Sequence, residues 1–577
     1  MTWNDDEAAW SSSGWTLVRR RGDEFADIAF HGRRVLRSVR LAVRDRDWNT
    51  LPLSVDEVRD EPGCLRLGVR ASADPGGLEG ELVARAEGDR LEIAVDLICT
   101  AAFETNRTGL VVLHPPRVSG RALGVDHPDG SSEATRFPDG ISPHQPATDI
   151  VALRWTSDAG EMRMTFSGDV FEMEDQRNWT DASFKTYSRP LALPFPVRLA
   201  AGERVAQTVT IERVGPVPPP EPTGPAVIDL RTEGTAPSLG IAASTAPDPV
   251  EGVGDRAFPV DTVLVELDLA SPAWRAALAR AQRAGLPLDV RFVVDEQRPD
   301  ALQDGVDALA GIEVRRVAAF RANGPARHVS DAETVAALRA ASGRAGLRAP
   351  VAGGVRTHFT ELNREHHRLP AGLDGLGFAI TPLFHDVSTA QLVESVAMQR
   401  RVAEQAVRLS GGIPVDIGPI GLLPHVNAVA TTAEPRPSQP DLRDGYGPAL
   451  LPSTDPRQDA VELAAWTIAS AAALIVPGVR SLTYFEEWGA RGIRRPDGTD
   501  RPVAVAIAAL AELGGHPALT GDSPDGSVWA VGALTPSGAV VLLANLGDRA
   551  RDLEIRTPGG STSVRLERSG WARIVLP

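Results

Sequence analysis

Short buried strands and amphipathic helices alternate through the middle of the chain, and this alternation constrains the fold more than any other feature. The expected strands are Leu239–Ala243, Thr262–Asp268, Leu288–Asp295, Val314–Ala319, Val351–His358, Gly377–Leu383, Pro414–Gly418 and Ser481–Phe485. The expected helices are Ala273–Ala284, Ala332–Ala341, Ala390–Leu409, Gln458–Leu474 and Val503–Leu513. Eight strands, each followed by a helix or a long connection, predict a (β/α)8 barrel, because an open doubly wound sheet normally stops sooner.

The flanking regions follow a different pattern, in which short runs of alternating apolar residues are separated by turns. Residues 1–214 predict an antiparallel β-sandwich, and residues 516–577 a small β-domain. The proline-rich segment 215–225 is too poor in backbone donors for a helix or a central strand, so we expect a linker there. The predicted fold is therefore multidomain α/β plus β, with the barrel assigned to residues 226–515.

Charge and composition narrow the kind of ligand. The chain has 60 basic and 76 acidic residues, a net charge of −16, which disfavours nucleic acid as a ligand and leaves a neutral or weakly charged small molecule as the easier partner.

Cys64 and Cys99 have no cysteine or histidine spacing typical of a zinc site and are expected to be buried free thiols. No cofactor or metal is indicated. The acidic start and the absence of a long apolar run favour a cytoplasmic protein without a membrane span. The oligomeric state is left open.

Polar residues gather where the predicted barrel strands end, which is where active sites lie on this fold. Glu361 and Glu486 follow different strands and form a candidate pair for acid–base chemistry on a sugar, with His385 as a third catalytic candidate. Because adjacent strand residues point to opposite sides, only one of Glu486 and Glu487 can face the barrel mouth, and Glu486 is preferred. His385 has a structural alternative, since Asp386 or Ser388 can cap the helix that follows.

A second polar run, Phe171–Tyr187, lies within the predicted sandwich. It has too many acids and amides to bury unsatisfied and is too aromatic for a purely solvated loop, so it predicts an interdomain seam or a wall of the barrel mouth. Together the two regions supply the candidate substrate-binding residues Glu174, Asp175, Asn178, Trp179, Lys185, His358, Asn363, Arg364, His425, Asn427, Tyr484, Glu487 and Trp488. The stretches 103–109 and 114–116 are interpreted as surface turns.

The run Glu172–Tyr187, with Asn106-Arg107-Thr108-Gly109 and His114-Pro115 upstream, resembles the D-apionate lactonase family. The barrel segments His358–Arg364 and Tyr484–Gly489 are compatible with this resemblance. It implies an esterase-type hydrolase on a glycosidase-like barrel, one that opens D-apionolactone to D-apionate in bacterial apiose catabolism. Glu361 or Glu486 would then activate water, and His385, Asn363 or Arg364 would stabilise the oxyanion.

The sequence lacks two motifs that are typical of other barrel glycosidases and of esterases. The common retaining barrel glycosidases carry Asn-Glu after the fourth strand and a nucleophile after the seventh, whereas these strands end in Ala318-Ala319-Phe320 and Gly418-Pro419-Ile420. The chain also lacks a Gly-x-Ser-x-Gly elbow, which disfavours a serine esterase.

Two alternatives stay open. One is a glycoside hydrolase acting on a small or furanose sugar glycoside, with Glu361 as acid and Glu486 as nucleophile or base. The other is a carbohydrate-binding protein without catalysis, in which replacing either glutamate would leave binding intact.

Overall fold

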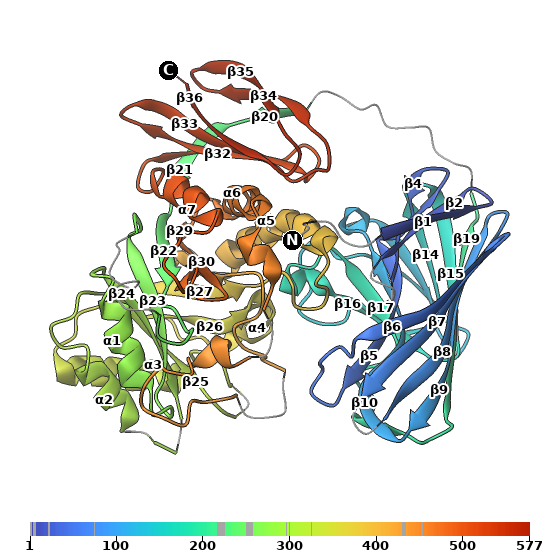
Figure 1. Ribbon diagram of the computed structural model, residues 1–577, viewed down its shortest axis with the longest axis horizontal. Helices are drawn as coiled ribbons and strands as arrows, with labels where there is room; N and C mark the ends of the chain where they lie inside the picture. The colour runs from blue at the N-terminus through green and yellow to red at the C-terminus, as the bar shows by residue number, and fades with distance from the viewer. Residues whose placement is uncertain are drawn as a thin grey trace.

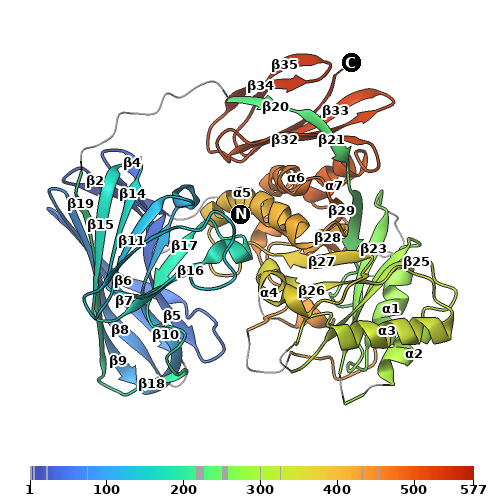
Figure 2. The same cartoon turned by 180° about the vertical axis from the view of Figure 1, so that it is seen from behind.

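The computed structural model describes residues 3, 7–20, 24–73, 76–215, 226–249, 258–295, 297–298, 300–324, 326–429, 434–451 and 454–576. Figure 1 shows the N-terminal sheets (blue to cyan) beside the barrel (green to orange), with the C-terminal sheets (red) above the barrel. Figure 2, from behind, shows the sandwich strands β16 and β17 turned toward helices α4 and α5 of the barrel. The predicted linker 215–225 lies outside the described residues, apart from Gly215.

The N-terminal part is an antiparallel sandwich of two sheets, as predicted. In the first sheet the order is β1 (Glu7–Ser12), β2 (Trp15–Arg20), β3 (Glu24–Phe30), β5 (Ser38–Asp45), β10 (Phe103–His114), β17 (Phe184–Tyr187), β16 (Phe171–Asp175) and β13 (Ala147–Ile150), with β4 (Arg33–Arg34) on β3 and β18 (Val197–Leu199) on β10. The second contains β12 (Ser132–Arg136), β11 (Ala122–Asp126), β14 (Ala152–Ser157), β15 (Gly160–Ser167), β19 (Arg204–Arg213), β9 (Arg90–Ala101), β8 (Gly76–Glu87), β7 (Cys64–Ala73) and β6 (Leu53–Glu61). Apolar side chains from both sheets form one core.

The parallel strands of the barrel match the eight predicted from the sequence. They are β22 (Ser238–Ala242), β23 (Thr262–Asp268), β24 (Leu288–Val294), β25 (Val314–Arg321), β26 (Ala352–His358), β27 (Gly375–Ile380), β28 (Val415–Ile420) and β29 (Val479–Trp488), with β30 (Gly492–Arg494) added beside β29. A parallel bridge between Val317 and Val351 brings β25 next to β26 and nearly closes the barrel.

The helices lie outside this sheet. They are α1 (Trp274–Gln282), α2 (Ala301–Asp307), α3 (Ala332–Ala345), α4 (Phe359–Glu365), α5 (Thr389–Leu409), α6 (Glu462–Leu474) and α7 (Val503–Ala511). Short 3₁₀ turns include η1 (Pro116–Val118), η2 (Gln176–Trp179), η4 (His366–Arg368), η5 (Gly447–Leu450) and η6 (Pro456–Asp459). Helices α2 and α4 were not predicted, because both are only about two turns long and therefore show little periodicity.

The C-terminal β structure recruits strands from before the barrel. β20 (Ala226–Asp229) pairs with β34 (Arg551–Thr557), which also pairs with β35 (Gly560–Leu566). β21 (Arg231–Thr235) pairs with β31 (Pro517–Thr520), followed in the sheet by β32 (Val528–Thr535), β33 (Gly538–Asn545) and β36 (Trp571–Leu576). Residues 226–235 were expected in the barrel, and this expectation is wrong, because their partners lie about three hundred residues away and leave no local signal.

Three further expectations can be compared with the structure. Cys99 is buried and Cys64 half-buried, and both are free thiols. The stretch 103–109 is wrong as a surface turn: it forms part of β10, where Asn106 and Arg107 are buried. His114, at the end of β10, is likewise buried and contacts the hydroxyl of Thr186 at 3.0 Å. Within the described ranges, no helix is both long and apolar enough to cross a membrane.

Candidate active site

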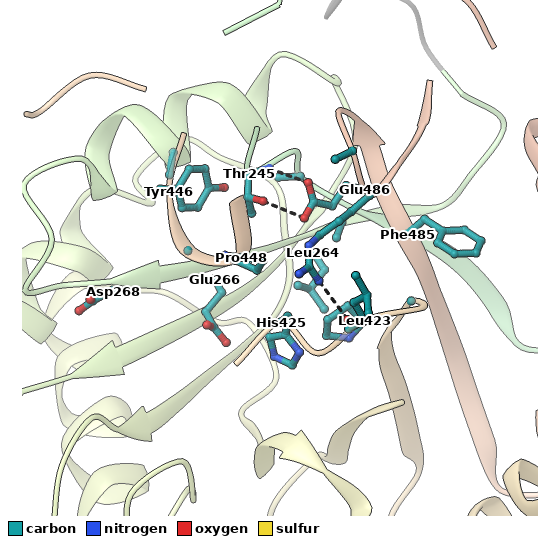
Figure 3. A pocket seen from close by; sticks show the side chains of 18 of the residues that line it. Thr245, Leu264, Glu266, Asp268, Leu423, His425, Tyr446, Pro448, Phe485 and Glu486 are labelled. Carbon is teal, nitrogen blue, oxygen red and sulfur yellow. Dashed lines mark hydrogen bonds between the residues drawn. The ribbon is translucent and has the colours of Figure 1, made fainter. Parts of the chain in front are cut away.

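A pocket opens at the carboxyl ends of the barrel strands, and we call it the mouth pocket. Residues that line it include Ala242, Thr245, Leu264, Glu266, Asp268, Arg356, Thr381, Leu423, His425, Glu434, Arg436, Tyr446, Glu486 and Arg491. Figure 3 shows Glu486, Thr245 and Tyr446 grouped on one side of this pocket and Glu266 and His425 on the other. Its position is the one that the barrel fold reserves for chemistry.

Glu486 is held by Thr245, which follows the first barrel strand. The Thr245 hydroxyl donates to Oε1 at 2.8 Å and the Thr245 backbone N–H donates to Oε2 at 2.9 Å. Burial raises the pKa of Glu486, while these bonds and Arg491 oppose the rise. Each carboxylate oxygen can accept a further hydrogen bond, so the group is fixed in place and still able to take a proton from water.

A bulge in β29 decides which of the two adjacent glutamates faces the pocket. The pairing of β22 with β29 shifts between Ile241, opposite Tyr484, and Ala242, opposite Glu486. The extra residue, Phe485, has a φ of +50° and points away from Glu486 (Figure 3). One inserted residue reverses the inward–outward alternation, which turns Glu486 into the mouth pocket. A positive φ at a bulky residue is strained and typical of functional sites.

Two buried polar atoms of the mouth pocket lack a hydrogen-bond partner in the part of the chain that the structure describes. Arg491 donates through Nη1 to the carbonyl oxygens of Leu423 and Pro424 at 3.0 and 2.8 Å, but its buried Nη2 has no hydrogen-bond partner among the described residues. The buried Nε2 of His425 is likewise unpaired within the described part of the chain. Burial and the nearby Arg356 lower the pKa of His425 to about 3, so its ring is neutral at pH 7. Buried polar atoms normally have partners, so these two are available to a ligand.

Opposite Glu486, charged groups from three segments meet. Arg356 of β26 donates through Nε to Glu266 at 3.1 Å and through Nη1 to Glu434 at 2.9 Å. Arg436 pairs with Asp268 at the end of β23. The segment after β28 is thereby tied across the mouth pocket, and the carboxylates of Glu266 and Glu434 are engaged by one guanidinium.

A second pocket, the seam pocket, lies between the sandwich and the loops that follow β27 and β28. Its polar and aromatic lining residues include Arg40, Arg44, Trp48, Arg107, Glu174, Gln176, Trp179, Asp181, Lys185, Tyr187, Arg364, Phe384, His385, Asp386 and Asn427. Leu423 lines both this pocket and the mouth pocket. The predicted contribution of the run Phe171–Tyr187 is thus placed beside the barrel mouth, at the interdomain seam.

One ion pair and one hydrogen-bonded pair organise the polar side chains of the seam pocket. Lys185 contacts Glu174 at 2.6 Å, and this cation together with His385 lowers the pKa of Glu174 although burial alone would raise it. His385 Nδ1 lies 2.9 Å from Asp181, and burial lowers the pKa of His385 well below its usual value while raising that of Asp181. The expected helix cap is also present, because Ser388 accepts from the backbone of Gln391 at the start of α5.

The structure distributes the predicted site residues over distinct places. Glu486 and His425 line the mouth pocket, and Trp488 lines a hollow next to it. Glu174, Trp179, Lys185, Arg364, His385 and Asn427 line the seam pocket. The described linings of these pockets do not include Glu361, Asp175, Asn178, His358, Asn363, Tyr484 or Glu487.

Most of these residues, which line none of the three pockets, form hydrogen bonds or ion pairs with other protein groups. Asp175 pairs with Arg177 at 2.7 Å, and Asn363 donates to Asn178 at 2.9 Å across the seam between the domains. Tyr484 contacts Ser470 of α6 at 2.8 Å. His358 contacts the hydroxyl of Thr381. The two glutamates are considered next.

Glu361 and Glu487 are two predicted site carboxylates that, unlike Glu486, do not line the mouth pocket. Glu361 lies in the first turn of α4 and accepts from the Thr357 hydroxyl at 2.8 Å. Burial raises the pKa of Glu361 and of Glu487 to about 7. Although their pKa values are raised, neither carboxylate lines the mouth pocket, which contains Glu486 and Arg491.

The family follows from comparison with known proteins. Residues 3–215 match the family model described as D-apionate lactonase, N-terminal domain, and residues 240–515 match the one described as D-apionate lactonase, TIM barrel domain. The chain belongs to the D-apionate lactonase family. Since a lactonase cleaves a cyclic ester with water, membership of this family makes the protein a hydrolase.

A curated member of the D-apionate lactonase family, the D-apionate lactonase of Brucella anthropi, is 27% identical over 541 residues, which is 85% of each chain. Among solved structures, a GH30 endoxylanase from Clostridium papyrosolvens C71 has 11% identity and a TM-score of 0.41, covering 61% of this chain and 99% of the xylanase. A beta-arabinopyranosidase has 10% identity and a TM-score of 0.31, covering 98% of this chain and 96% of the other.

For this member of the D-apionate lactonase family, sequence reasoning missed several residues of the two pockets. Glu266 and Asp268 end the second predicted strand, so the rule that found Glu486 could have found them. Tyr446 lies in the long connection after β28, and Arg491 lies in the short turn between β29 and β30, so neither carries such a signal. Arg107 belongs to a run that supported the resemblance but was interpreted as a turn.

Proposed function

We propose that the protein opens the ring of a sugar lactone, D-apionolactone or a related aldonolactone, by carboxylate-assisted attack of water in the mouth pocket. The observation that carries this proposal is the position of Glu486, a buried carboxylate fixed by Thr245 in the pocket that Arg491 also lines. The Nη2 of Arg491 has no hydrogen-bond partner among the described residues. A carboxylate base and an oxyanion donor that line one pocket are the groups that ester hydrolysis needs. The name of the Brucella anthropi relative supports the choice of substrate.

In the first step Glu486 accepts a proton from water as the water oxygen bonds to the lactone carbonyl carbon. The carbonyl π electrons move onto its oxygen, and Arg491 Nη2 donates to the resulting oxyanion. The guanidinium is always protonated, so this donor needs no proton transfer of its own.

In the second step the tetrahedral intermediate collapses. The carbonyl re-forms, the bond to the ring oxygen breaks, and Glu486 returns its proton to the leaving ring oxygen. The product is an open-chain hydroxy acid that ionises at neutral pH. Burial keeps the pKa of Glu486 above its usual value, which suits a group that first accepts and then donates the same proton.

Neighbouring groups fit the hydroxyls of the sugar. The neutral ring of His425 offers an unpaired nitrogen, and burial raises the pKa of Tyr446, which keeps its hydroxyl protonated as a donor. In Figure 3 that hydroxyl points toward Thr245. Recognition of a polyhydroxy ring therefore needs no group beyond those lining the pocket.

The decisive experiment is a pH-stat assay of acid release from a panel of aldonolactones, including D-apionolactone, run beside aryl glycosides. Acid release from lactones without glycoside cleavage supports the proposal, and glycoside cleavage alone overturns it in favour of the glycosidase alternative. A role in carbohydrate catabolism and a cytoplasmic location stay predictions.

A further inference from the structure

The seam pocket has more cations than anions. Five basic side chains line it, Arg40, Arg44, Arg107, Lys185 and Arg364, against three carboxylates, Glu174, Asp181 and Asp386. The whole chain has the opposite balance, with a net charge of −16. A concave site with a local excess of positive charge on an acidic protein selects small anions.

Arg107 is the least compensated of these cations. Its side chain is 6% exposed, and Nη1 donates to the carbonyl oxygen of its neighbour Asn106. Its Nε and Nη2 are buried and have no hydrogen-bond partner in the described residues. These two nitrogens form one edge of the guanidinium, the edge that engages both oxygens of a carboxylate.

Aromatic side chains keep Arg107 in position. Its guanidinium carbon lies 5.1 Å from the centre of the Trp48 ring and 5.5 Å from that of Phe195. Burial is the main reason that the pKa of Arg107 is lowered, and a bound anion would relieve this penalty. The side chain is thus buried between aromatic rings, and none of the described carboxylates is hydrogen-bonded to its Nε–Nη2 edge.

A second arginine of the seam pocket, Arg44, lies close to another cation. Arg44 donates to the carbonyl oxygen of Trp48 at 3.2 Å. Burial and repulsion from Arg40 lower its pKa to about 10. Repulsion between two cations in one pocket falls when an anion binds between or beside them.

The rest of the seam pocket fits a chain of hydroxyl-bearing carbons. Trp179 and Phe384 are parallel, at an interplanar angle of 5° and a centroid distance of 6.4 Å, and Arg364 lies 5.2 Å over Trp179. Flat aromatic faces pack against sugar C–H groups, and the carboxylates of Glu174 and Asp181 can accept from hydroxyls.

We propose that the seam pocket is a binding site for a small sugar acid, with the Nε–Nη2 edge of Arg107 holding its carboxylate and Trp179 packing against its carbon chain. This proposal rests on the proposed function in one respect, because ring opening of a lactone yields an acid of this class. The mouth pocket adjoins the site through Leu423, whose carbonyl oxygen accepts from Arg491.

The test is isothermal titration calorimetry on the full chain carrying Glu486→Gln, which removes turnover. The probes are sodium D-apionate and sodium D-gluconate, with the neutral D-glucitol and inorganic phosphate as comparisons. We expect saturable binding of an aldonate and at least tenfold weaker binding of D-glucitol and phosphate. Equal binding of D-glucitol, or tighter binding of phosphate, overturns the proposal.

Variants of Arg107 locate the site. Arg107→Gln is expected to weaken aldonate binding at least tenfold, and Arg107→Lys, which keeps the charge but loses the two-nitrogen edge, is expected to weaken it severalfold with unchanged circular dichroism. Arg117→Gln, at an exposed arginine of the same domain, is the matched control and should change nothing. Unchanged binding in a folded Arg107→Lys variant overturns the assignment. Aldonate binding without lactone turnover by the unmodified protein would refute the proposed function and leave this inference standing.

Discussion

Thr245 donates to both carboxylate oxygens of Glu486, at 2.8 Å from its hydroxyl and 2.9 Å from its backbone N–H. Thr245 follows β22, the first strand of the barrel, and Glu486 lies near the carboxyl end of β29, the last. The contact therefore joins adjacent strands where the sheet opens into the mouth pocket. A carboxylate held at both oxygens keeps its orientation while a free lone pair on each oxygen faces the ligand. The arrangement makes Glu486 the group on which hydrolysis should depend most.

Glu486→Gln should lower kcat for lactone opening by about a hundredfold to ten-thousandfold, the usual contribution of a general base. The amide keeps the size of the side chain but cannot accept the proton of water. Steady-state kinetics on the best lactone substrate measures this effect. Glu487→Gln is the matched control, because the bulge at Phe485 leaves that carboxylate outside the mouth pocket. Equal losses in both variants would contradict the assignment.

Replacing Thr245 should shift the pH dependence of kcat. The active form of Glu486 is the carboxylate and its pKa is raised by burial, so activity should fall on the acid side at a pH above the ordinary glutamate value of 4.5. The Thr245 hydroxyl opposes that rise. Thr245→Val should therefore move the acid limb to higher pH, and Thr245→Ser, which retains the hydroxyl, should restore it. A Val variant with an unshifted limb would show that this bond does not tune the base.

Arg491 should act on the transition state more than on substrate binding. Arg491→Gln is expected to lower kcat by about a hundredfold to a thousandfold with a smaller change in KM, as loss of one oxyanion donor does in other hydrolases. A KM increase at constant kcat would instead assign Arg491 to uniform substrate binding. Circular dichroism controls for the loss of the bonds to Leu423 and Pro424.

The parts of the fold that the sequence predicts are those with a local pattern. Each barrel strand is a short apolar run, and each run is found within a few residues of its structural bounds, because burial on both faces demands such residues. The pairing of Ala226 with Leu553 depends on residues far apart in the chain and leaves no periodicity. Composition alone could not place that strand outside the barrel.

The candidate site, like the fold, was predictable from the sequence only where a local pattern marks it. Glu486 is found by its position after a strand, whereas the choice over Glu487 depends on a φ of +50° at Phe485, a conformation that sequence gives no reason to expect. Glu361 follows a strand too, yet α4 starts at the next residue after His358 and removes the loop that would have carried it to the mouth pocket. Residues such as Arg491 reach the site from connections whose course only the tertiary structure determines.

The charge network that joins the sandwich to the barrel should control stability at low pH. Arg37 of the sandwich donates to Glu394 of α5 at 2.6 Å, and Arg37 is 1% exposed. Burial opposes ionisation of Glu394, but Arg34 and Arg37 outweigh it and lower the pKa of Glu394 from 4.5 to about 2. Since a lowered pKa means that the folded state binds the proton less readily, this stabilisation is present above pH 4.5 and is lost as the pH falls toward 2.

Glu394→Gln should therefore lower the thermal unfolding midpoint at pH 7, because it removes the hydrogen-bonded carboxylate of the buried Arg37 and leaves it with the more distant Asp386, at 3.6 Å. The loss is about 3 kcal/mol for a typical buried pair. The difference from the unmodified protein should shrink as the pH is lowered from 5 toward 2. Circular dichroism melts at pH 7, 5 and 3 measure both effects. Arg204→Gln, which breaks a surface pair with Asp96, is the control and should change the midpoint little at any of these values. A Glu394→Gln difference that does not vary with pH would show that the lost stability comes from packing and not from the ionised pair.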